Sequence, residues 1–175
     1  MSDPVTVARV HDRGMILIRA GAPLMAAMAA ALGLETPAPL RATLAGDRAL
    51  VWFGPDEALA LTPAAEVPAA LDALRAAAGG GHALVLEMTD ARVLFRLTGA
   101  GAREVLAKGA PVDLTPAAFD VGHARRTHLG QVACAFWRTD DHPETFELIC
   151  FRSVADYVEA WLATAADPAA RVGWF

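Results

Sequence analysis

Two stretches of this chain repeat the same order of apolar runs and turn residues, and this repeat limits the folds that the chain can adopt. Residues 16–19 and 93–96 are short apolar runs that each lead into a predicted helix. Three more predicted strands follow each run, and an amphipathic helix closes each half, at 64–78 and at 153–165. The order predicts an α+β fold of duplicated strand-helix-strand units, with antiparallel sheets and packed helices.

The length of 175 residues suits one domain, or two small domains that share a core. We therefore expect residues 1–175 to form one compact domain with two pseudo-repeated halves, at about 14–80 and 82–165. Residues 1–13 are polar and rich in turn residues, so we predict that they form a lead-in arm.

The first half contains a predicted helix between its first and second strands. Strands are expected at 15–18, 41–44, 49–53 and 58–61. The helix presents one apolar face, made by Met25, Met28, Ala29 and Leu32. Gly33 follows the last turn, where a glycine commonly ends a helix.

A second helix closes the first half. Thr62 is its predicted N-cap, and Pro63 takes the first helical position. Gly79-Gly80-Gly81 ends it. Glycines that cradle a phosphate lead into a helix N-terminus, whereas these follow a helix and precede a strand. We interpret them as a structural stop.

The second half ends in a hairpin and a closing helix. Its predicted strands lie at 84–88, 93–97, 125–129, 132–137 and 146–151. The first two of these are either separate strands or one long bent strand with a break at Asp90, and a short helix after them ends near Gly109. We predict an irregular segment at 111–116, a polar loop at 139–143, and Ser153 as the N-cap of the closing helix.

The cysteines and histidines do not form a metal-binding pattern. If the hairpin pairs symmetrically about residue 142, Cys134 lies opposite Cys150, and we expect two buried, reduced thiols. No two histidines have the i,i+4 spacing of a helical metal site; they are His11, His82, His123, His128 and His142. We predict no metal.

Charge and hydropathy narrow the classes of partner. A net charge of -5 argues against a nucleic-acid-binding protein, which needs a basic face. The N-terminal residues lack the features of a signal peptide, and no apolar run is long enough to span a membrane. We therefore expect a cytoplasmic protein that does not bind membranes. A hydrophobic content of 55% leaves room for the exposed apolar patch of a subunit with partners.

Three polar clusters have a functional and a structural interpretation. Asp90-Ala91-Arg92 fits a binding pair or a turn at a strand end with a local ion pair. Arg125-Arg126 fits a docking site for an acidic partner or a solvated strand edge, and Asp140-Asp141-His142 fits acid–base chemistry or a polar hairpin loop.

At the end of the chain, Trp174-Phe175 would be costly to expose unless the aromatic rings dock on this chain or on a partner.

The order of several motifs over residues 45–165 is similar to that of a known family. The motifs are Trp-Phe-Gly-Pro-Asp-Glu at 52–57, Thr-Asp-Ala-Arg at 89–92, Leu-Thr-Gly-Ala-Gly-Ala-Arg-Glu-Val-Leu-Ala-Lys-Gly at 97–109, Pro-Val-Asp-Leu at 111–114, Phe-Glu-Leu at 146–148 and the segment 152–162. The chain resembles the gamma subunit of heterotetrameric sarcosine oxidase, whose fold is related to that of the folate-binding aminomethyltransferases, including the glycine cleavage T-protein.

This resemblance implies a hetero-oligomer that oxidatively demethylates sarcosine to glycine, formaldehyde or methylenetetrahydrofolate, and hydrogen peroxide. It implies that larger partner subunits hold FAD, FMN, NAD and tetrahydrofolate, and that the gamma subunit holds no cofactor. The chain would then be a non-catalytic subunit that supports assembly.

One departure from the aminomethyltransferases supports a non-catalytic subunit. Those enzymes place acidic residues after the glycine of the central hairpin, where a carboxylate assists the folate amine. The matching residues after Gly130 are Gln131-Val132-Ala133-Cys134, and none can transfer a proton as a carboxylate does. We predict no catalytic residue in this chain and assign no cofactor-binding residue. The alternatives are a stand-alone folate-binding module and a scaffold without a ligand.

Overall fold

The structure, a computed structural model, describes residues 5–174. Its strands are β1 (Thr6–Val10), β2 (Arg13–Ala20), β3 (Ala42–Ala45), β4 (Arg48–Gly54), β5 (Glu57–Pro63), β6 (Ala83–Glu87), β7 (Arg92–Thr98), β8 (Ala124–Leu129), β9 (Val132–Asp141) and β10 (Glu144–Phe151). Its α-helices are α1 (Ala22–Ala31), α2 (Val67–Ala78), α3 (Ala102–Ala107) and α4 (Ala155–Ala166). Short 3-10 turns are η1 (Ala64–Glu66), η2 (Thr89–Ala91), η3 (Arg152–Val154) and η4 (Pro168–Ala170).

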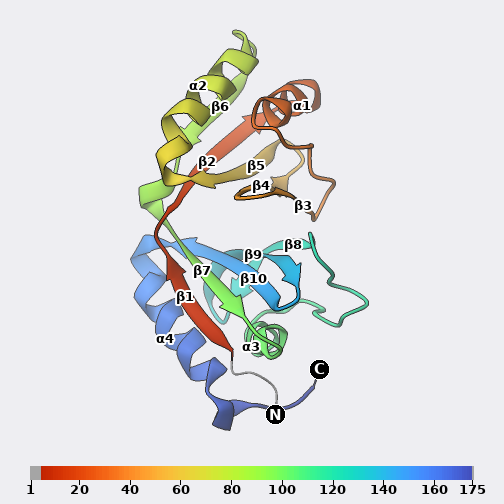
Figure 1. The fold of residues 1–175 in the computed structure, drawn as a ribbon, viewed down its shortest axis with the longest axis vertical. Helices are drawn as coiled ribbons and strands as arrows, with labels where there is room; N and C mark the ends of the chain where they lie inside the picture. Colours follow the sequence, from red (N-terminus) through yellow and green to blue (C-terminus); the bar gives the residue numbers. More distant parts are fainter. Residues whose placement is uncertain (1–4, 175) are drawn as a thin grey trace. The chain divides into compact units, whose positions relative to one another are not determined.

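These elements form two compact units, each with its own sheet and core (Figure 1). The continuous unit is Asp12–Asp90. The split unit joins the described residues up to His11 with those from Ala91 onward. The prediction of one compact domain with halves at about 14–80 and 82–165 stays a prediction. In the structure, β6 pairs with β2 and so belongs to the sheet of the continuous unit.

The sheet of the continuous unit has five antiparallel strands in the order β3-β4-β5-β2-β6. Both α1 and α2 pack on one face of it (Figure 1). Ile16, Ile18 and Leu50 of the strands lie there with Met28 of α1 and Leu74 of α2, all fully buried. This burial of the apolar face stabilises the two helices on the sheet.

The end of α1 shows how the sequence sets a boundary. Gly33 has a φ of +70°, a conformation that favours glycine. Its N–H donates to the Ala30 carbonyl, and the N–H of Leu34 donates to the Ala29 carbonyl. This pair of bonds is the Schellman arrangement that satisfies the last carbonyls of a helix, and it confirms the predicted end.

The sheet of the split unit is also five-stranded and antiparallel, in the order β1-β7-β10-β9-β8. The helices α3 and α4 pack on one face, where Leu106 and Leu162 meet the strand residues Phe95 and Phe136. The segment after α3 adds Phe119 to this core, and its ring lies 5.7 Å from that of Phe136. The residues between α3 and β8, 108–123, which we name the crossing segment, therefore contribute side chains to the core.

The two units repeat one order of elements. The series β2-α1-β3-β4-β5-α2 matches β7-α3-β8-β9-β10-α4, as the predicted duplication requires. The fifth strand differs in origin: β6 follows α2 and pairs with β2, whereas β1 precedes the continuous unit and pairs with β7. The α+β class with antiparallel sheets and packed helices is confirmed.

Several predicted boundaries are wrong. The lead-in arm at 1–13 contains strand β1, because residues 6–10 pair with the distant β7; residues 1–4 lie outside the described part. The polar loop at 139–143 is mostly strand, since β9 continues to Asp141. Thr62 lies in β5 and Ser153 in η3, so neither side chain caps a helix.

Candidate functional site

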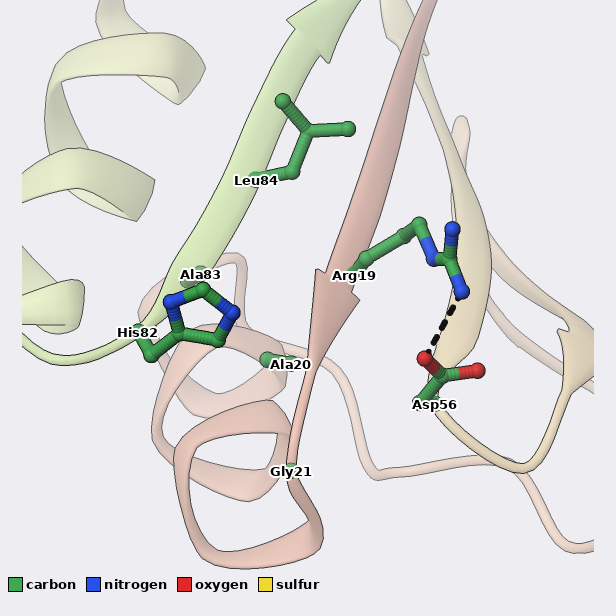
Figure 2. Close-up of a pocket in the computed structure, with 7 residues that line it drawn as sticks. All are labelled: Arg19, Ala20, Gly21, Asp56, His82, Ala83 and Leu84. Atoms are coloured by element: carbon green, nitrogen blue, oxygen red, sulfur yellow. Dashed lines mark hydrogen bonds and ion pairs between the residues drawn. The ribbon is translucent and has the colours of Figure 1, made fainter.

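A hollow of about 500 Å³ in the continuous unit combines charged and apolar side chains (Figure 2). It lies where β2 ends, β6 begins and α1 starts. Arg19 of β2 stands opposite Leu84 of β6 in the sheet, and Asp56 comes from the turn before β5. His82, just before β6, lines the same hollow. We take this as the candidate site because it is the largest of the hollows described here.

An ion pair occupies one side of the hollow. Arg19 Nη2 donates to Asp56 Oδ2 at 2.9 Å (Figure 2). Arg19 Nε also lies 3.9 Å from Glu57 Oε2. Both Arg19 and Asp56 are about half exposed, at 51% and 56% of the side chain. Such a pair contributes little stability in water. Its chemical consequence is that two carboxylates already offset the arginine charge.

The hollow has no group prepared for catalysis. His82 is exposed, and in Figure 2 no interaction joins its ring to the Arg19–Asp56 pair. General acid–base work needs a proton-transfer group held against its partner, and nucleophilic work needs an activated side chain. The described residues of the hollow include neither. The arrangement suits contact with a polar surface better than a reaction.

A second hollow of about 330 Å³ in the continuous unit is mainly apolar. Its wall includes Met25 of α1, Trp52 of β4, and the prolines Pro37 and Pro39 of the loop before β3. Trp52 and Pro55 belong to the motif at 52–57 that carries the family resemblance. In the split unit, a hollow of about 380 Å³ lies on the outer face of α4, beside Tyr157, Trp161 and Lys108.

The clusters singled out from the sequence have structural roles. Arg92, at the start of β7, lies over the Phe151 ring at 4.8 Å, and Asp90 is exposed in η2. The local ion pair of Asp90-Ala91-Arg92 stays a prediction. Arg125 lies over the Phe119 ring at 5.4 Å, and Arg126 is exposed on β8 at the end of the sheet. The basic pair therefore lies on an edge strand, and docking of an acidic partner there stays a prediction.

The acidic residues before the hairpin turn are also held structurally. Asp140 Oδ1 accepts from the backbone N–H groups of His142 and Asp141, at 3.0 Å and 2.7 Å, and these bonds lower the pKa of its carboxyl. Asp141 pairs with Arg138. A carboxylate bound to backbone amides in its own turn is a poor candidate for a general acid.

The two thiols lie opposite each other, as predicted. Cys134 and Cys150 are partners in the β9–β10 register, and both are free and buried. Burial, followed by the neighbouring Cys150, raises the pKa of Cys134 to about 12. Burial raises the pKa of Cys150 to about 11. Because the thiolate is the nucleophile and the metal ligand, these groups are inert at neutral pH.

A buried arginine that the sequence did not single out organises the split unit. Arg103 of α3 is 3% exposed and donates from Nε and Nη2 to Glu144 Oε1, at 3.0 Å and 2.9 Å. Its Nη1 donates to the carbonyls of Phe119, at 3.0 Å, and Leu114. Arg138 adds a second charge, 3.1 Å from Glu144 Oε1. This network ties the crossing segment to the helix and the hairpin.

A second buried charge holds the C-terminal segment. Glu104, 5% exposed, accepts from the backbone N–H groups of Val172 at 2.6 Å and Gly173 at 2.8 Å. Burial raises the pKa of Glu104, but the two amide bonds and Lys108 outweigh it, so the pKa lies below its usual range. Lys108 Nζ in turn donates to the carbonyls of Ala165 and Ala170. The motif at 97–109 contains these residues, but their distant partners could not be read from it.

The described residues offer neither a cluster of metal ligands nor a helix that could span a membrane. Within residues 5–174, no group of three or more His, Cys, Asp or Glu side chains is placed to hold a metal ion. None of the helices in this part of the chain combines the length and the hydropathy needed to cross a bilayer.

The amino-acid sequence is similar to one known protein family and to individual proteins. Residues 19–168 match the family described as "Sarcosine oxidase, gamma subunit family". The sequence is 36% identical over 143 residues to sarcosine oxidase subunit gamma of Corynebacterium sp. (strain U-96), a match that covers 80% of this chain and 67% of that protein.

The fold of the chain is also similar to those of solved structures. A chain of the heterotetrameric sarcosine oxidase from Corynebacterium sp. U-96, solved with pyrrole 2-carboxylate, has a TM-score of 0.87 at 30% identity, over 98% of this chain and 88% of that one. The glycine cleavage system aminomethyltransferase T from Bartonella henselae has a TM-score of 0.67 at 17% identity, over 91% of this chain and 45% of that one. The second likeness concerns the fold alone.

Proposed function

The chain belongs to the sarcosine oxidase gamma subunit family, and we propose that it is the non-catalytic gamma subunit of a heterotetrameric sarcosine oxidase. In this role it supports the assembly of larger flavin-bearing subunits, which carry out the oxidative demethylation of sarcosine. The observation that carries the proposal is the fold likeness to the heterotetrameric enzyme, with a TM-score of 0.87 over 98% of this chain.

The chemistry of the chain supports a role without catalysis. The residues after Gly130 are Gln131-Val132-Ala133-Cys134, so the hairpin position that carries a carboxylate in aminomethyltransferases has none. The thiol at its end has a pKa raised to about 12. The buried side chains of Arg103 and Glu104 are hydrogen-bonded to the backbone of other segments. These groups stabilise the protein, and none is free to move a proton during a reaction.

The two hollows of the continuous unit do not fit the cofactors that the resemblance implies. The phosphate of a flavin or of NAD needs an unopposed cation or helix amides. In the hollow of about 500 Å³, Arg19 faces Asp56 and Glu57, so a phosphate there would meet two carboxylates. At the start of α1 beside it, Pro23 has no N–H, and the N–H groups of Leu24 and Met25 already donate to the Gly21 carbonyl. The apolar hollow near Trp52 contains Glu57 and no basic side chain. We propose that FAD, FMN, NAD and tetrahydrofolate are held by partner subunits.

Affinity purification from the source cells tests the proposed function. The tagged chain should carry with it larger chains that show flavin absorbance and oxidise sarcosine with formation of peroxide. The isolated chain should bind no flavin and should not turn over sarcosine. Recovery of the chain without any flavoprotein, or sarcosine oxidation by the isolated chain, would contradict the proposal. The cytoplasmic location stays a prediction.

The alternative is a stand-alone folate-binding module. The fold likeness to aminomethyltransferase T favours it, although the match covers 45% of that chain. Titration of the purified chain with tetrahydrofolate separates the two proposals. Saturable binding by the isolated chain would favour the module, and no binding would favour the assembly subunit.

A further inference from the structure

The C-terminal residues Val172 and Trp174 are exposed although the backbone between them is held in place. Val172 is 56% exposed and Trp174 is 74% exposed. An unanchored tail would leave such side chains free to fold back on an apolar surface. Here the backbone amides of Val172 and Gly173 are bound to Glu104, as described above, and the tryptophan remains in solvent.

The carboxylate that holds the segment is costly to bury. A buried charge needs hydrogen bonds and an opposite charge to be tolerated. Glu104 receives two amide bonds, and Lys108 Nζ lies 3.5 Å from its Oε1. The same lysine fixes the chain just before the segment by donating to the Ala170 carbonyl at 2.8 Å. Glu104 of α3 and Lys108, the residue that caps this helix, thus both bind one short stretch of backbone.

The local backbone conformation fits this anchoring. Asp167 accepts from the Ala169 N–H at 2.8 Å and starts the turn η4, which leads into the segment. Gly173 has a φ of +80°, which favours glycine, and no atom lies within 4 Å of a Cβ built on it. The glycine is therefore needed for its conformation and not for space. It sets the direction in which the chain continues to Trp174.

We propose that residues 171–174 form a preformed docking segment whose Trp174 side chain inserts into an apolar pocket of a larger subunit of the oxidase complex. This inference rests on the proposed function, which supplies the partner. A tryptophan brings a large apolar area and is a frequent anchor of protein interfaces. A segment that is already ordered loses less conformational entropy on binding. The net charge of -5 disfavours an anionic lipid surface as the occupant.

The test measures reassembly of the full chain with its partners. The co-purified complex is stripped of this chain, and the remaining flavoprotein is titrated with wild-type or variant chain. Trp174→Ala should weaken binding by about 30-fold, as expected for an interface anchor. Leu86→Ala is the matched control, because Leu86 is also a large exposed apolar residue, at 44%, and lies on β6 of the continuous unit. It should leave binding within about 2-fold.

A second variant tests whether the segment is preformed. Glu104→Gln keeps Trp174 and removes the charge that anchors the backbone. Hydrogen exchange at the Val172 and Gly173 amides of the free chain should become faster. Binding should weaken by about 3- to 10-fold, the effect of ordering a side chain or two at the moment of association.

The outcomes separate this inference from the proposed function. Wild-type chain that binds no flavoprotein overturns both. Wild-type chain that binds, with Trp174→Ala binding equally well, overturns the docking segment and leaves the proposed function intact. Self-association of the free chain that disappears in Trp174→Ala would make a second copy the occupant and would overturn the assignment to a larger subunit. Equal losses in Trp174→Ala and Leu86→Ala would show a non-specific effect and would also overturn it.

Discussion

The two units share an order of elements but hold their irregular segments in different ways. In the continuous unit, the segment from α1 to β3 is fixed by backbone turns such as the one at Gly33 and by the half-exposed Arg48, which donates to the Leu32 carbonyl at 3.1 Å. In the split unit, the corresponding segment from α3 to β8 is fixed by the buried Arg103. A duplicated fold can thus use surface contacts in one copy and buried charge in the other.

The difference follows from how much core each segment contributes. The crossing segment of the split unit places Leu114 and Phe119 in the core, at 2% and 0% exposure, so its carbonyls are buried and need donors. One arginine supplies several donors in a fixed geometry. The segment before β3 also places Leu34 in a core, at 7% exposure. However, Arg48, which binds the Leu32 carbonyl there, is 44% exposed. The buried arginine therefore accompanies the segment whose core residues are the more deeply buried.

The largest effect should come from Arg103→Ala. Removing it leaves Glu144 and the carbonyls of the crossing segment without their donor, and breaking a buried charged contact costs about 3–5 kcal/mol of unfolding free energy. Urea unfolding can be followed by the reaction of the two thiols with a colorimetric disulfide reagent. Both cysteines of the chain lie in the split unit, so the reaction reports that unit alone. A transition at the wild-type urea concentration would contradict the role of Arg103.

A smaller effect is expected from Gly14→Ala in the continuous unit. A Cβ there would lie 1.9 Å from Val67 Cγ2, so α2 would have to move away from β2. Overpacking of this kind costs about 1–3 kcal/mol. Faster hydrogen exchange should be confined to β2 and α2 and their neighbours. Gly54→Ala is the control, because its Cβ would make an ordinary contact of 3.6 Å with Glu57; an equal loss in both would argue against the steric cause.

Acidification should release the C-terminal segment before either core unfolds. The pKa of the Glu104 carboxyl is lower in the folded chain than its usual value, because backbone amides and Lys108 stabilise the charged form more than burial disfavours it. Its stabilising contribution is therefore present above about pH 4.5 and is lost as the pH falls through the folded pKa. NMR signals of the Val172 and Gly173 amides should shift over that range. The same titration of Glu104→Gln should show no such step, and a step that persists there would assign the effect to another group.

The smallest effect is expected from Arg48→Ala. Arg48 Nη2 donates to Glu66 Oε2 at 2.6 Å, but both side chains are more than 40% exposed. An ion pair of this kind contributes little stability and is screened by salt. Removal of Arg48 should raise the pKa of Glu66 toward its usual value, because Arg48 is the main cause of its lowering. A carboxyl titration by NMR would detect this. A loss of stability as large as that of Arg103→Ala would remove the contrast between the units.

Local patterns predicted the repeat, the class of fold and the hairpin register. Symmetric pairing of the hairpin about residue 142 predicted that Cys134 lies opposite Cys150, as it does in the structure. Helix starts were less accurate. Thr62 has the composition of an N-cap, yet β5 continues through it, and its hydroxyl donates to Glu66 instead. The chain enters α2 through η1, with Pro68 in the first turn of the helix. Non-local pairing of β5 overrides the local preference for a cap.

The buried charges could not be predicted from the sequence. Arg103 and Glu104 lie in a six-residue helix, too short for a clear apolar face. Their partners are far along the chain, at 114, 119, 144, 172 and 173. The strand β1 was missed for the same reason, since it pairs with β7. The candidate site was likewise assembled by the fold: Arg19, Asp56 and His82 belong to three separate segments.

The pairing of β1 with β7 has a consequence for how the protein is made. On the ribosome, β1 is synthesised before the whole of the continuous unit, and its partner β7 only after it. The continuous unit can form its sheet from one uninterrupted length of chain. The split unit must instead pair β1 with β7, which the residues of the continuous unit separate in the sequence. Contacts between distant segments form slowly, and domains tend to fold in the order of synthesis. We expect Asp12–Asp90 to fold first during translation, with β1 waiting as an unpaired strand until β7 emerges.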